Sequence, residues 1–183
     1  MFSLIRWYKL RRHRIGVGVH SPFAYRVVRD VIYGKGHYYA VGRMSCLTMR
    51  YPKRLRRTYE VMFRLIARLA PDGIRLSDSM EPQLELLVRM ADMRPIMGRG
   101  LGGYRDGKRI LTVCEALDLR KGLPGNMLRS GNMAVVRNLH DVAGILDTLK
   151  ETMEGGWIFF DRRMAILVSD RDVPLYETEL KMT

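Results

Sequence analysis

The clearest pattern in the chain is a helical repeat of apolar positions between Lys53 and Leu69. Apolar side chains recur there at three- and four-residue intervals, at Leu55, Tyr59, Met62, Phe63, Ile66 and Leu69. This spacing places them on one side of a helix. The other side is basic and carries Lys53, Arg54, Arg56, Arg57, Arg64 and Arg68. The pattern predicts an amphipathic helix with a cationic outer side.

A shorter helix is predicted between Ser21 and Tyr33. Ser21 can cap its first turn, and Pro22 suits the first helical position because it has no N–H group to leave unpaired. The apolar positions of this helix are Phe23, Val27 and Val31. Because the apolar sides of both helices need a partner surface, we expect both to pack on the rest of the protein. A short basic helix is also predicted over residues 2–12.

After a turn at residues 71–73 the pattern changes to short apolar runs that alternate with helical segments. Strands are predicted at residues 74–77, 110–114, 133–136, 157–160, 164–169 and 175–182, and helices at 81–93 and 141–153. Asp78 or Ser79 is the predicted cap of the first of these helices. Alternating strands and helices predict an α/β domain with a mostly parallel sheet, and the three closely spaced final strands predict an antiparallel edge.

Charge divides the chain at the same turn. Residues 1–71 carry a net charge of +14, with Asp30 and Glu60 as their only acids, whereas residues 72–183 carry −1. We therefore predict two parts, a basic helical region (1–71) and an α/β domain (72–183). The basic part is expected to meet a polyanion. Nucleic acid is slightly favoured over anionic membrane, and an acidic protein is a further alternative.

Several kinds of site find no support in the sequence. The two cysteines, Cys46 and Cys114, fit neither a disulfide framework nor a Cys-rich metal site, and the four histidines lack metal-site spacing. Residues 98–103 match G-x-G-x-x-G, but their flanks predict neither a strand nor a helix, so we interpret residues 98–107 as a surface loop. No apolar run approaches the roughly 20 residues that span a bilayer, and the N-terminus lacks a secretion signal. Cytoplasmic location is the resulting expectation.

Two segments carry a resemblance to a known family. Residues 20–25 (HSPFAY), followed by Tyr38-Tyr39, resemble the N-terminal helical region of a bacterial subgroup of class I S-adenosylmethionine-dependent methyltransferases. Residues 133–140 (MAVVRNLH) look like the fifth strand of that fold and its polar turn. The segments after them are similar to its last helix and closing antiparallel strands. The likeness covers about half the chain and implies a reduced Rossmann-like sheet preceded by basic helices.

The resemblance also implies a cofactor site, for S-adenosylmethionine, with Asp78 and Glu115 as binding candidates. Glu115 is a ribose-binding acid if residues 110–114 are the family's second strand, and has another role if they are its fourth. The family has a glycine-rich turn after its first strand, but residues 74–87 (IRLSDSMEPQLELL) contain no glycine. We therefore expect a methyltransferase-like protein with a degenerate or altered cofactor site and no metal. The alternative is a non-catalytic module that binds a polyanion through the basic helices.

Overall fold

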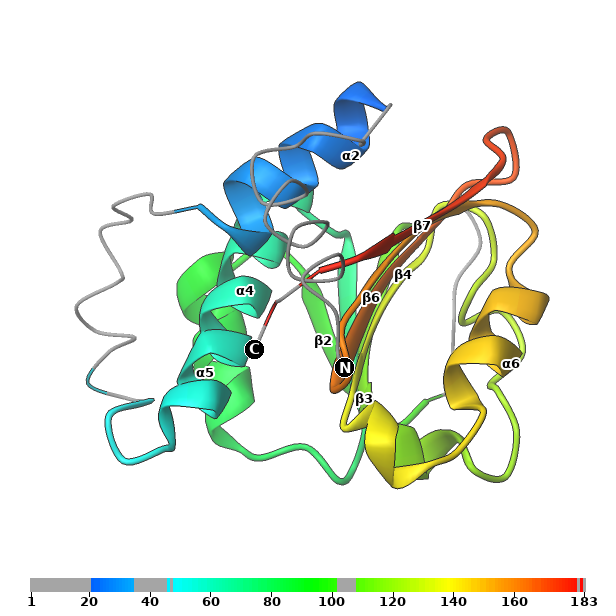
Figure 1. Cartoon of the computed structure of the whole chain (residues 1–183). Helices are drawn as coiled ribbons and strands as arrows, with labels where there is room; N and C mark the ends of the chain where they lie inside the picture. The colour runs from blue at the N-terminus through cyan, green and yellow to red at the C-terminus, as the bar shows by residue number, and fades with distance from the viewer. Residues whose placement is uncertain (1–20, 35–45, 47, 102–107, 181, 183) are drawn as a thin grey trace, which may run out of the picture.

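The computed structural model describes residues 21–34, 46, 48–101, 108–180 and 182. Its centre is one seven-stranded sheet in the order β2-β1-β3-β4-β6-β5-β7. Figure 1 shows this sheet between helices on its two sides. The strands are β1 (Gly73–Leu76), β2 (Ile96–Arg99), β3 (Ile110–Glu115), β4 (Met133–Arg137), β5 (Gly156–Phe160), β6 (Met164–Ser169) and β7 (Leu175–Glu179). The predicted helix over residues 2–12 and the Tyr38-Tyr39 segment lie outside the described residues.

The sheet is mixed. Strands β1 to β4 pair in parallel, and β6 runs antiparallel to both of its neighbours, β4 and β5. The predicted antiparallel edge is confirmed for β6 but wrong for the last pairing, because β7 pairs with β5 in parallel. The reason is that β6 already uses both of its edges, which leaves β7 only the outer edge of β5. The α/β class and the Rossmann-like kind of sheet are confirmed.

Helices cover both faces of the sheet. One face carries α2 (Pro22–Arg26), the π-helix η1 (Val27–Ile32), α4 (Lys53–Leu69) and α5 (Gln83–Ala91), and the other carries α6 (Ile145–Thr152) (Figure 1). Two short 3₁₀ helices, η2 (Ala116–Leu119) and η3 (Leu139–Asp141), follow β3 and β4. No described helix has the length and apolarity needed to cross a membrane.

Most predicted helices are confirmed, with changes at their ends. α4 has the predicted bounds, and the main-chain N–H of Ala24 donates to Ser21 Oγ (3.4 Å), as the predicted cap requires. α5 has Pro82 at its N-cap, so the predicted capping by Asp78 or Ser79 is wrong. α6 begins late, at Ile145, because Gly144 before it adopts a left-handed conformation (φ 74°) that interrupts the helix.

The interpretation of the 98–107 segment as a loop is wrong at its start. Ile96–Arg99 forms β2, which pairs in parallel with β1 from Gly73 to Leu76. Ile96 donates its main-chain N–H to Asp72 O (3.1 Å), which continues this pairing beyond the strand. Sheet pairing outweighs weak strand propensity here, because β1 would otherwise expose unpaired main-chain groups.

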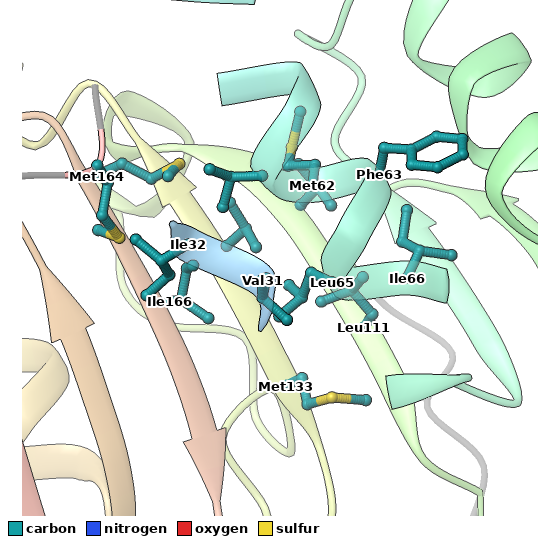
Figure 2. Close-up of a cluster of buried hydrophobic side chains, with 14 of the residues drawn as sticks. Val31, Ile32, Met62, Phe63, Leu65, Ile66, Leu111, Met133, Met164 and Ile166 are labelled. Carbon is teal, nitrogen blue, oxygen red and sulfur yellow. The ribbon is translucent and has the colours of Figure 1, made fainter. Parts of the chain in front are cut away.

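One hydrophobic core joins the N-terminal helices to the sheet. Figure 2 shows side chains of η1 and α4 packed against strand side chains, with Val31, Ile32, Met62, Phe63, Leu65, Ile66, Leu111, Met133, Met164 and Ile166 labelled. Farther along, the rings of Phe23 and Trp157 lie 4.5 Å apart between centroids. The expected packing of both helices on the rest of the protein is therefore confirmed. Residues on the two sides of the 71–73 turn bury the same core.

Candidate functional site

The carboxyl ends of the central strands form the candidate site. β1 lies between β2 and β3, although both follow it in the sequence, so the chain leaves β1 toward one side of the sheet and later returns on the other. In α/β sheets, ligands bind at such a switch point, beside the carboxyl ends of the strands. The side chains that follow β1, β3 and β4 therefore decide what this protein can hold there.

A hydrogen-bonded cluster ties the turn after β1 to η2. Asp118 Oδ2 accepts hydrogen bonds from Ser77 Oγ (2.5 Å), Ser79 Oγ (2.7 Å) and the main-chain N–H of Glu115 (2.9 Å). The Ser77 side of this cluster is buried. One carboxylate thus engages both serine hydroxyls that follow β1.

Arg137 links the other polar groups at this edge. It ends β4, and its side chain is only 7% exposed. Its guanidinium donates to both Glu81 carboxylate oxygens (3.1 and 2.8 Å) and, through Nε, to Glu115 Oε1 (3.0 Å). Glu115 Oε2 accepts a further hydrogen bond from Asn138 Nδ2 (2.8 Å). Arg137 therefore connects the turn after β1 with the ends of β3 and β4.

Burial and charge act in opposite directions on the pKa values of Glu81 and Arg137. Burial alone would raise the pKa of Glu81, but hydrogen bonds from Arg137 and its charge hold that pKa below its ordinary value. Burial would lower the pKa of Arg137, but Glu81 and Glu115 together raise it. Burial, reinforced by the charge of Glu81, raises the pKa of Tyr59 to about 12. Tyr59 reaches this pair from α4, and its hydroxyl makes no hydrogen bond of regular geometry within the described part of the chain.

The two sequence-predicted cofactor residues lie in different surroundings. Asp78 is exposed in the turn after β1, whereas Glu115 is held in the ion pair with Arg137. Sequence reasoning missed Glu81, Asp118 and Arg137 as members of this network. An available signal was Arg137 itself, a lone cation that closes the apolar run MAVVR of a strand buried on both faces.

The predicted basic side of α4 is divided in the structure. Lys53 and Arg54 in its first turn are exposed, and Arg56 and Arg57 are half-buried. Arg64 is buried and donates through Nε to the main-chain oxygen of Val31 (2.6 Å), which holds η1. Arg68 donates to Asp30 Oδ2 (2.9 Å), also on η1. Lys53 and Arg54 are therefore the exposed cations of the first turn, whereas Arg64 and Arg68 join α4 to η1.

Within the residues that the structure describes, no three His, Cys, Asp or Glu side chains gather in a way that could hold a metal ion. Comparison with known proteins gives no family: no family model, no curated protein and no solved structure matches this chain.

Proposed function

We propose that this protein is a methyltransferase-like protein of the class I kind whose S-adenosylmethionine site is altered, so that the cofactor binds weakly or not at all. The observation that carries the proposal is the Arg137 network. It joins Glu81, Glu115 and Asn138 across the ends of the strands where the cofactor is expected. These polar groups bind one another.

The strand order supports the methyltransferase-like part of the proposal. The resemblance assigns β4 as the fifth strand, with closing antiparallel strands after it, and β6 indeed runs antiparallel beside β4. β3 precedes β4 in the chain and lies next to it, which favours the reading of β3 as the fourth strand. In that register Glu115 is not the ribose-binding acid. The second strand is then β2, which ends in Arg99, a cation that pairs with Glu85 (2.8 Å).

The residues after β1 do not fit the cofactor. A glycine is needed where a ligand comes close to the main chain, and the turn has Ser77, Met80 and Glu81 instead. The Met80 side chain is buried in the core, and the Ser77 hydroxyl is bonded to Asp118. The turn after β1 therefore lacks the open main chain that S-adenosylmethionine would need there.

Calorimetric titration of the protein with S-adenosylmethionine is expected to show no saturable binding in the micromolar range, because the polar groups of the site already have partners. S-adenosylhomocysteine lacks the sulfonium charge, so its titration is the matched control for the effect of that charge on binding. A dissociation constant near 1 μM for either ligand, about −8 kcal/mol, would contradict the altered-site proposal.

A second function, polyanion binding, is favoured by a different observation. The first turn of α4 contains no acid, and Lys53 and Arg54 in it are exposed. Cations at a helix start oppose the helix dipole, at a cost of about 0.3–1 kcal/mol each, which an anionic partner would offset. In this reading the α/β domain is a non-catalytic scaffold.

Binding of a fluorescent DNA duplex, followed by anisotropy, is expected to weaken steeply between about 50 mM and about 200 mM salt, because each neutralised phosphate releases counterions. The positive charge of the protein attracts any anion, including that of the added salt. The affinity for the duplex is therefore compared in chloride and in glutamate salts at equal ionic strength. Absence of binding to duplex, single strand and anionic vesicles at about 50 mM salt, where such contacts are strong, would rule out this second function.

A further inference from the structure

A chain of hydrogen bonds holds the start of α4 near the turn between β5 and β6. Arg57 donates through Nε to the main-chain oxygen of Met182 (3.1 Å), and the main-chain N–H of Met182 donates to Asp161 Oδ2 (3.0 Å). Asp161 Oδ1 in turn accepts from the main-chain N–H of Arg163 (2.8 Å). Two segments that are far apart in the sequence are thereby brought to the same edge of the sheet.

Both segments present cations there. Lys53 and Arg54 precede Arg57 by four and three residues, so the three lie on one side of α4. Arg162 and Arg163 in the β5–β6 turn are exposed. We name this set the basic ridge; it consists of Lys53, Arg54, Arg57, Arg162 and Arg163. Two acids lie beside it. Asp161 accepts hydrogen bonds from main-chain N–H groups on both of its oxygens, and Glu179 ends β7 opposite Phe160.

The geometry points to the basic ridge as a surface that binds the phosphate backbone of nucleic acid, built jointly by the basic region and the α/β domain. This inference rests on the polyanion-binding function proposed above and gives it a location. Arg54, Arg162 and Arg163 are exposed, and the planar guanidinium of an arginine matches the oxygens of a phosphate. Arg57 holds the two segments together through the main-chain oxygens of Met182 and Ile32. Backbone contacts of this kind position a protein without reading sequence, so binding is independent of base sequence.

The packing of α4 favours nucleic acid over a membrane as the partner of this surface. A helix that binds a membrane surface inserts an apolar face beside its cations. The apolar side of α4 is instead buried in the core, at Tyr59, Met62, Phe63 and Ile66. The helix therefore offers its charges, and no apolar face, at this surface.

The test compares charge reversals in the two segments of the ridge with one outside it. The probe is a fluorescein-labelled DNA duplex of about 20 base pairs, and anisotropy is measured from about 50 mM to about 200 mM salt. The variants are Lys53→Glu/Arg54→Glu and Arg163→Glu, with Arg163→Gln as a neutral second variant. The control is Arg171→Glu, an exposed arginine that follows β6 and lies at the opposite end of that strand from the β5–β6 turn. Thermal unfolding of each variant verifies that it is folded.

Each ridge variant is expected to weaken duplex binding and to reduce the slope of log affinity against log salt by about 0.9 for each phosphate contact removed, whereas Arg171→Glu leaves the slope unchanged. If Arg163→Glu behaves like Arg171→Glu while Lys53→Glu/Arg54→Glu weakens binding, polyanion binding stands and the joint ridge is overturned. If the unmodified protein binds phosphatidylserine vesicles but no duplex, the assignment to nucleic acid is overturned. If it binds neither, both the ridge and the polyanion-binding function fail.

Discussion

Replacement of Arg137 by alanine is expected to lower the free energy of unfolding by about 3–5 kcal/mol, because it leaves two carboxylates at a buried edge without their cation. Arg137 is the shared partner of Glu81 and Glu115, whose side chains are 28% and 14% exposed. Urea unfolding followed by circular dichroism measures the change. Arg171→Ala is the matched control, since its side chain is 72% exposed, and we expect it to stay within about 0.5 kcal/mol of the unmodified protein.

The two carboxylate partners provide a further comparison. Glu81→Ala is expected to cost less than Arg137→Ala, because Arg137 keeps Glu115 as its partner and no acid is left unpaired. Equal stability of Arg137→Ala and the unmodified protein would show that the network does not hold the edge of the sheet together. It would also remove the main support for an altered cofactor site.

Truncation of Ile32 to alanine is expected to cost about 2–5 kcal/mol, although this residue lies in the basic region and far in sequence from the sheet. Ile32 is fully buried in the core that η1 and α4 share with the strands (Figure 2). Near- and far-ultraviolet circular dichroism during urea unfolding measures both the loss of stability and the cooperativity of unfolding. Leu86→Ala on α5 is the control, because Leu86 is 53% exposed.

A single transition, shifted to lower urea for Ile32→Ala at both wavelengths, is the expected outcome, because one core joins the two parts. Two separate transitions, of which only one responds to the substitution, would mean that the basic region and the α/β domain unfold independently. The two parts that differ in net charge, residues 1–71 and 72–183, would then also be separate units of stability.

The parts of the fold that sequence predicted well are those with a strong local pattern. The bounds of α4 follow from six apolar positions in a helical repeat, and β3 and β4 follow from short, mainly apolar runs that are buried on both faces. Local pattern decides these elements because their own side chains supply the burial.

The parts that sequence missed depend on partners elsewhere in the chain. β2 is a strand because β1 has a free edge with which it can pair. Both edges of β6 are already paired, so β7 pairs with the outer edge of β5, and this sets its direction. The Arg137 network joins the turn after β1 with the ends of β3 and β4, and Glu81 and Arg137 are 56 positions apart. Spacing along the chain contains no signal for such a contact, since it arises only when the strand ends are brought to one edge.

The joining of α4 to the β5–β6 turn also has a consequence for the rate of folding. The hydrogen bond from Arg57 to Met182 spans 125 positions, and the Phe23 and Trp157 rings close a loop of similar size. Contacts of such range are entropically costly to form and are associated with slow folding. The β5–β6 hairpin, with its short turn, needs no such closure. We therefore expect the hairpin to form early and the helical layer to dock late, so that the sheet face under η1 and α4 stays exposed to solvent for most of the folding reaction.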